Sequence, residues 1–209
     1  MTISLICFNL AAFLYELSLD KAGLVRFISA WGATPNQFRE YDLIAYPTVF
    51  TSMFLHGGWG HIIGNMLYLW IFGDNVEDLL GKFRFVIFYL LCGVVASLSH
   101  IRVSLLLGRG DLPSIGASGA VAGILGAYLL YFPRARVLAS VPVGFFLRIV
   151  RVPALLFLGL WIVIQLVSGA ASLPGTEGGG GIAFFAHIGG FFTGLILIKA
   201  FALGRRRPV

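Results

Sequence analysis

Long stretches without a charged side chain constrain this fold more than any other feature of the sequence. Only 11% of the 209 residues are charged and 58% are apolar, whereas soluble domains carry about 25% charged residues. This composition excludes a soluble globular domain and a disordered chain. Because about 20 apolar residues cross a bilayer as a helix, the length allows about six crossings. The sequence therefore predicts an all-α, multi-pass membrane protein.

Six segments are expected to form membrane helices within a single domain that covers residues 1–209. Their approximate ranges are 1–19, 58–73, 85–101, 115–132, 152–171 and 182–203. The segment 20–57 contains Pro35 and Pro47 and is expected to form a structured loop at the outer membrane interface. The first segment has no basic region in front of it and no small-residue cleavage site, so we interpret it as a membrane helix.

The positions of Lys and Arg predict how the chain is oriented. Basic residues are concentrated in the connections 74–84 and 133–151 and after residue 203. Because cytoplasmic connections carry an excess of Lys and Arg, we expect a plasma or inner membrane protein with both termini in the cytoplasm. The second, fourth and sixth helices then begin at the outer side. The net charge of +6 is interpreted as a topology signal, and no nucleic-acid partner is expected.

Four polar side chains are expected at a similar depth, just below the outer surface. His61 and Asn65 lie four residues apart and therefore share one helix face. Ser118 lies near the start of the fourth expected helix, and His187 lies near the start of the sixth. Polar groups inside a bilayer are costly, so these residues are candidates for a functional site.

Glycine spacing predicts that the fourth and sixth helices touch. The small residues are Gly119, Gly123 and Gly126 on one helix, and Gly190 and Gly194 on the other. Small residues let helix backbones approach closely in lipid, which would place Ser118 opposite His187. A hydroxyl bonded to an imidazole is the activated form of a serine nucleophile. Since no carboxylate is expected at that depth, we predict a Ser–His dyad that needs no metal or organic cofactor.

These residues resemble those of the rhomboid family of intramembrane serine proteases. The matching segments are 54–56, 61–65, 116–119 and 186–190, followed by Gly194. The resemblance covers nearly the whole chain and implies a six-helix bundle that cleaves membrane-spanning helices in a water-filled cavity open to the outside. It implies that Ser118 is the nucleophile and His187 the base, and that an acyl-enzyme forms. His61 and Asn65 would line the oxyanion hole.

The resemblance also suggests residues around the site and two departures from the common pattern. The residues expected around the cavity are His56, Gly116, Gly119, Ala122 and Gly190. Ala122 stands where members often have an aromatic residue packed on the histidine, so another group must orient His187. Tyr46-Pro47-Thr48 stands roughly where a Trp-Arg pair is often found. Gln165 is expected to form a hydrogen bond between helices rather than to contact substrate.

The glycine-rich segment 175–181 is expected to form a movable cap over the cavity. The expected substrates are transmembrane proteins in the bilayer. One alternative is a non-catalytic rhomboid-like factor that binds and routes membrane proteins, against which the complete set of Ser118, His187, His61 and Asn65 argues. Another alternative is a transporter or channel, which would need inverted repeats, broken helices or buried charges, whereas the sequence shows no internal repeat and no charge in mid-membrane.

Overall fold

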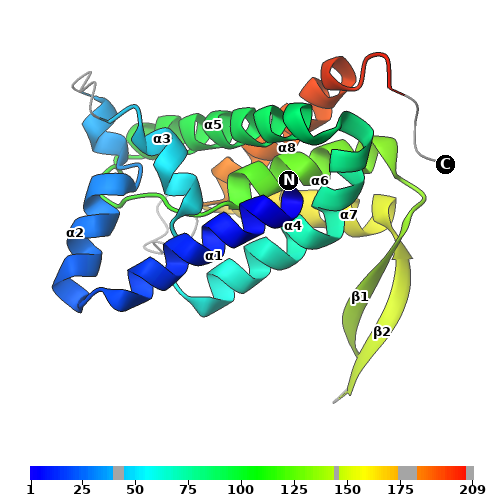
Figure 1. Cartoon of the computed structure of the whole chain (residues 1–209), viewed down its shortest axis with the longest axis horizontal. Helices are drawn as coiled ribbons and strands as arrows, with labels where there is room; N and C mark the ends of the chain where they lie inside the picture. The colour runs from blue at the N-terminus through cyan, green and yellow to red at the C-terminus, as the bar shows by residue number, and fades with distance from the viewer. Residues whose placement is uncertain (40–44, 144–145, 174–182, 206–209) are drawn as a thin grey trace.

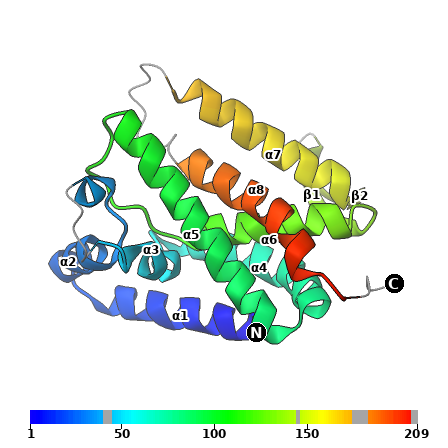
Figure 2. The same ribbon diagram turned by 90° about the horizontal axis from the view of Figure 1, so that it is seen from above.

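The computed structural model describes residues 1–39, 45–143, 146–173 and 183–205, and most of these residues are helical. Figures 1 and 2 show the arrangement of the helices. The helices are α1 (Thr2–Ser18), α2 (Lys21–Trp31), α3 (Thr48–Thr51), α4 (Trp59–Leu80), α5 (Lys82–Leu106), α6 (Ser118–Tyr131), α7 (Ala154–Ala171) and α8 (Ala183–Phe201). The remaining elements are the 3-10 helices η1 (Pro35–Phe38) and η2 (Ser52–Phe54) and the strands β1 (Arg136–Val143) and β2 (Phe146–Pro153).

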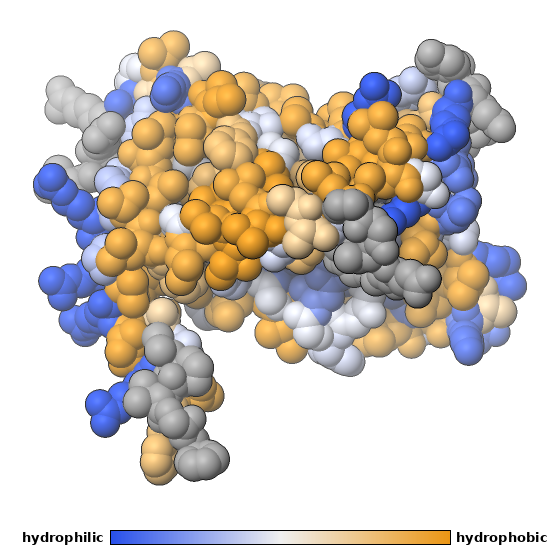
Figure 3. Space-filling view, turned by 180° about the vertical axis from the view of Figure 1, so that it is seen from behind, coloured by the Kyte–Doolittle hydropathy of each residue, from blue (hydrophilic) through white to orange (hydrophobic). Residues whose placement is uncertain are grey.

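The apolar surface identifies the chain as a membrane protein. Among the described residues, three helices are each long and apolar enough to cross a bilayer: α5, α7, and α8 from Phe184 onward. Helices α1 and α6 are apolar but shorter. Figure 3 shows an apolar band across the molecule, with hydrophilic side chains gathered toward its two ends. An exposed apolar surface of this extent indicates contact with lipid, because soluble proteins rarely expose one to water.

Helix α6 forms the centre of the bundle and packs most closely against α8. It is buried continuously from Gly119 to Tyr128. Gly190 of α8 lies against the backbone carbonyl of Gly119, and Gly194 lies against that of Gly123, with no space for a side chain. The two glycine stripes therefore meet, as the sequence predicted. In Figure 2, α1 and α7 occupy opposite edges of this core, and α4, α6 and α8 run in the same direction.

Helix bounds differ from the expected ranges in two places that matter for the site. Helix α4 continues to Leu80, seven residues past the expected end, because Val76, Leu79 and Leu80 stay buried while Asp74 is exposed. Helix α6 begins at Ser118 instead of residue 115. The preceding residues are extended, since Ser114 pairs with Ala33 in an isolated antiparallel bridge. Ser118 is therefore the first residue of its helix.

The expectation of an all-α chain needs one correction, because β1 and β2 pair as an antiparallel β1–β2 hairpin. Its register runs from the pair Arg136–Pro153 to the pair Val143–Phe146. Helix α6 ends at Tyr131 just before Pro133, which cannot continue a helix. The Val and Ile residues that follow favour extended backbone. The arginines expected in a loop here thus lie on or beside a small sheet.

The segment between α1 and α4 is structured, and its described part is tied to the helices by hydrogen bonds. The Thr51 hydroxyl donates to the carbonyl of Trp31 over 2.7 Å. The backbone N–H of His56 lies 3.2 Å from each carboxylate oxygen of Glu16, a buried residue of α1. Glu16 thereby anchors the chain just before α4. The cap expected at 175–181 lies outside the described residues.

Candidate active site

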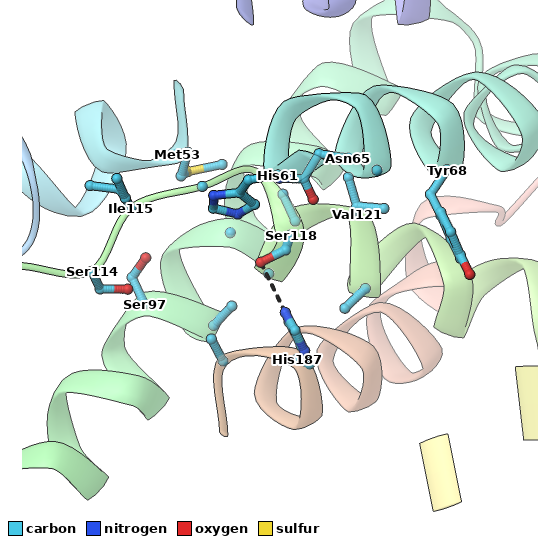
Figure 4. A pocket seen from close by; sticks show the side chains of 18 of the residues that line it. Met53, His61, Asn65, Tyr68, Ser97, Ser114, Ile115, Ser118, Val121 and His187 are labelled. Carbon is cyan, nitrogen blue, oxygen red and sulfur yellow. Dashed lines mark hydrogen bonds between the residues drawn. The ribbon is translucent and has the colours of Figure 1, made fainter. Parts of the chain in front are cut away.

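Ser118 and His187 are hydrogen-bonded across the contact between α6 and α8. The Ser118 Oγ lies 2.9 Å from the Nε2 atom of His187 (Figure 4). The glycine contact sets this distance, because Gly119 directly follows Ser118 and Gly190 lies one turn after His187. Both side chains are partly buried. The pair has the geometry of a hydroxyl that can pass its proton to an imidazole.

A cavity of about 390 Å³ surrounds this pair. Ser118 and His187 share it with Asn65, His61 and the indole of Trp161. The side chains of Ser118, His187, His61 and Asn65 come from three different helices and point into one space, whereas most of the remaining lining is apolar. Mostly apolar cavities with a few convergent polar groups are typical of binding and catalytic sites.

Hydrogen-bond donors line the cavity beside the serine. Asn65 Nδ2 is buried and has no hydrogen-bond partner among the described residues. The Nδ1 of His61 lies 3.3 Å from the backbone N–H of Gly57 and accepts its hydrogen bond, so the ring proton sits on Nε2. The N–H of Ser118 also has no acceptor within the helix, because Ser118 opens α6. These three donors are available to a negatively charged oxygen near Ser118.

Gly116 holds the chain between Ser114 and Ser118 against the ring of His61. Its φ of 122° lies in the left-handed region, which favours glycine. A Cβ at this position would come within 2.6 Å of the His61 ring. The N–H of Gly116 donates to the Ser52 carbonyl over 2.8 Å, which fixes the segment to η2. Gly116 therefore supports the position of His61 as well as that of the serine.

Comparison with known proteins identifies the family of this chain. Residues 45–204 match the family described as the Rhomboid domain. The chain belongs to the rhomboid family. It is 35% identical over 173 residues to Rhomboid protease GluP of Bacillus subtilis, covering 80% of this chain and 30% of that protein. Over 155 residues it is 32% identical to Rhomboid-like protein 11, chloroplastic, of Arabidopsis thaliana, covering 71% of this chain and 50% of that protein.

A third relative is Rhomboid protein 1, mitochondrial, of Saccharomyces cerevisiae, with 32% identity over 153 residues, or 71% of this chain and 40% of that protein. This chain thus spans half or less of the length of these three relatives. Rhomboids are generally intramembrane serine proteases.

The other residues expected around the site of this rhomboid fall into two groups. Gly119 and Gly190 form the helix contact, and Ala122 is buried and lines the cavity. His56 is buried outside the cavity lining, with its ring centroid 5.1 Å from that of His61. Its Nδ1 lies 3.3 Å from the carbonyl of Phe54. Burial lowers the pKa of His56 to about 4, and the nearby His61 adds to this effect.

The sequence did not identify what orients His187 in this rhomboid, although it required such a group. Two residues of α7 contact the imidazole. Gln165 Oε1 lies 2.8 Å from His187 Nδ1. The Trp161 ring lies 5.8 Å from the imidazole, centroid to centroid, at an interplanar angle of 40°. Gln165 was expected to form a hydrogen bond between helices, but no sequence pattern identified His187 as its partner.

Proposed function

We propose that this rhomboid is a serine endopeptidase that cleaves transmembrane segments of other proteins within the membrane. The observation that carries the proposal is the 2.9 Å contact between Ser118 and His187 inside a cavity. A serine that only packs between helices needs no imidazole partner. His61 and Asn65 of α4 place two hydrogen-bond donors in the same cavity, so the site contains groups for binding a reaction intermediate as well as the hydrogen-bonded pair.

In the proposed reaction, the Ser118 Oγ attacks the carbonyl carbon of the scissile peptide bond. His187 Nε2 accepts the hydroxyl proton as the new C–O bond forms. The tetrahedral intermediate then collapses, the C–N bond breaks, and the leaving amine takes the proton from His187. The product is an ester between the substrate acyl group and Ser118. Water hydrolyses this ester with His187 again acting as base, which regenerates the free serine.

The oxyanion of the tetrahedral intermediate would be held by the donors beside Ser118. Asn65 Nδ2 has no partner in the described part of the chain, the His61 proton sits on Nε2, and the Ser118 N–H faces no helix carbonyl. Donors placed in advance in a site of low dielectric constant stabilise developing charge more strongly than water does. Neither step of this reaction draws on a metal ion or an organic cofactor.

We further propose that α1, α4, α5, α6, α7 and α8 form six membrane segments, with both termini in the cytoplasm. The short α6 would extend over only about 21 Å, and its burial inside the bundle means that it need not span lipid on its own. The site lies at the end where α4, α6 and α8 begin. Arg84, Arg136 and Arg205 lie toward the other end, as expected for a cytoplasmic side.

Cleavage of a reporter transmembrane segment by the purified protein in liposomes tests this function. Ser118→Ala and His187→Ala should abolish cleavage while the proteins still insert and fold. Ser97→Ala is the matched control, because Ser97 lines the same cavity on α5. A fluorophosphonate should label wild-type protein and not Ser118→Ala. An unlabelled wild-type protein that binds but does not cleave membrane proteins would instead be a routing factor. Full activity of Ser118→Ala would refute the mechanism.

A further inference from the structure

We propose that Gln165 of α7 is a positioning residue that fixes which nitrogen of His187 carries the proton. This inference rests on the proposed function, because it concerns the base of the same reaction. Gln165 Oε1 lies 2.8 Å from His187 Nδ1, and a carbonyl oxygen can only accept a hydrogen bond. The ring proton is therefore held on Nδ1. Nε2 is left with its lone pair directed at the Ser118 hydroxyl, 2.9 Å away.

The placement of Gln165 on α7 supports this role. The inner face of α7 is marked by its buried residues, Ala154, Leu158, Ile162, Gln165 and Gly169. On the other faces, large apolar side chains such as Val163, Ile164 and Val167 are exposed. An amide on such a helix is costly unless it is paired, and Gln165 is only 8% exposed. The hydrogen bond to His187 offsets the free-energy cost of burying this amide.

Gln165 acts through His187 and not on the substrate. It is absent from the described lining of the cavity, whereas Trp161, one turn earlier on α7, lines the cavity and packs against the imidazole. One residue thus fixes the plane of the ring and the other fixes its tautomer. Ala122 of α6 offers no aromatic face at all. In this rhomboid, α7 therefore contributes to the chemistry of the base as well as to one wall of the site.

Two substitutions separate this role from simple packing. Gln165→Met keeps the length of the side chain but removes the acceptor, and Gln165→Glu keeps an acceptor at the same place. With a reporter segment in liposomes, we expect Gln165→Met to lower kcat by 10- to 1000-fold at nearly unchanged KM, since a wrong histidine tautomer is costly in serine proteases. Gln165→Glu should stay within about threefold of wild type. Ile164→Met, on the exposed face, should have no effect.

Nitrogen NMR of protein with labelled histidines gives a readout that does not depend on cleavage. In the wild type, Nδ1 of His187 should show the shift of a protonated nitrogen and Nε2 that of a bare one. In folded Gln165→Met the two forms should mix. Unchanged kcat and unchanged shifts in folded Gln165→Met would overturn the inference. Absence of Ser118-dependent cleavage in the wild type would instead refute the proposed function, and the NMR result would still decide the tautomer.

A second inference concerns the β1–β2 hairpin and rests on a different observation. The hairpin projects sideways from the end of the bundle where α6 ends and α7 begins, across the direction of the long helices (Figures 1 and 3). If those helices stand upright in a bilayer, the hairpin lies along the membrane surface beside the bundle. A two-stranded hairpin is only marginally stable by itself in water. We therefore expect its exposed face to contact a partner.

The side chains on that face indicate what kind of partner it binds. By register, Leu138 faces the same side as Ile149 and Leu147, and these side chains are 64%, 75% and 74% exposed. Arg136 and Arg151 lie on the same side and are also exposed. The sequence contains no Asp or Glu between Asp111 and Glu177 to neutralise them. We infer that this face binds the anionic phospholipid surface, with the arginines at the phosphates and the apolar side chains in the interface.

A spin label on the hairpin tests this inference. The label is placed by Ile149→Cys in a Cys7→Ser background, because Cys92 is buried. In nanodiscs that contain phosphatidylglycerol, the label should be accessible to oxygen and protected from an aqueous nickel chelate. Arg136→Glu with Arg151→Glu should raise accessibility to nickel severalfold. Arg26→Glu, an exposed position on α2, is the control and should change nothing.

Three results would overturn the lipid inference. The first is a label that stays accessible to nickel in anionic nanodiscs. The second is equal protection in nanodiscs of phosphatidylcholine alone, which would show that the arginines recognise no anionic lipid. The third is dipolar broadening between labels, which would show that a second copy of the chain covers the face.

Discussion

Gly190 packs directly on the backbone carbonyl of Gly119, and this contact lies one residue after Ser118 and three residues after His187. A close approach of α6 and α8 therefore occurs beside the hydroxyl and the imidazole that it brings together. Any side chain inserted here would move the two helices apart, since the obstacle is backbone and not a side chain that can rotate away. The contact between these two glycines thus helps to set the position of Ser118 relative to His187.

Gly190→Ala should separate the helices and weaken both stability and activity. Forcing a methyl group into a packed contact costs about 1–3 kcal/mol, so the unfolding midpoint in detergent should fall. Cleavage should drop more than tenfold because the 2.9 Å contact lengthens. Gly159→Ala on α7 is the control, since a Cβ there meets nothing within 4 Å. Full activity of Gly190→Ala would show that the close contact does not position the site.

Gly116→Ala should impair the site through His61. The residue combines a φ of 122° with a ring that would lie 2.6 Å from a new Cβ. Gly108→Ala is the control, because Gly108 has a φ of 68° but faces open space. Both variants should lose about 1–2 kcal/mol of stability from the left-handed backbone. Only Gly116→Ala should also lower kcat, and equal kcat in the two variants would contradict the role assigned to Gly116.

The pairing of α6 with α8 was predictable because the spacing of glycines within each helix marks the face that packs. Gly119 and Gly123 mark one helix face, Gly190 and Gly194 mark another, and close packing of small residues is what holds helices together in lipid. The approach of Ser118 to His187 then follows from their places in the same helices. The structure adds that Ser118 Oγ and His187 Nε2 are the bonded atoms and that they lie 2.9 Å apart.

The contact between Gln165 and His187 was not predictable, because it depends on how α7 is rotated about its axis. The helix is apolar on every side, so its sequence pattern does not say that Gln165 faces inward. The hairpin was missed for a related reason. Charged and apolar residues mix along 136–153, and a short exposed strand has no periodic signal that separates it from a loop.

Stability should depend on pH through His56, which lies outside the helices. Burial lowers the pKa of His56 to about 4, whereas an unfolded histidine titrates near 6.5. Between these values the unfolded chain binds a proton that the folded chain does not. Stability is therefore complete above about pH 6.5 and decreases as the pH falls toward 4, by up to about 3 kcal/mol from this residue.

The measurement is the unfolding midpoint between pH 8 and 4 in a Ser118→Ala background, which prevents self-cleavage. His56→Asn should flatten the curve, even if the variant is less stable at every pH. His56→Asn removes the ring that faces His61. It keeps the backbone N–H that is bonded to the Glu16 carboxylate, so this hydrogen bond is the same in both proteins. Parallel curves for the two proteins would show that His56 does not contribute to the pH dependence.

Asn65→Ala should lower turnover much more than it weakens substrate binding. Asn65 Nδ2 has no hydrogen-bond partner among the described residues, so this donor is free for an oxyanion that exists only during the reaction. Removing one such donor typically costs about 10²–10³ in kcat. Asn75→Ala is the matched control, because Asn75 lies on the same helix but is exposed near its other end. Initial rates over a range of reporter concentrations separate kcat from KM. A raised KM at unchanged kcat would mean that Asn65 binds the ground state of the substrate and does not stabilise the oxyanion.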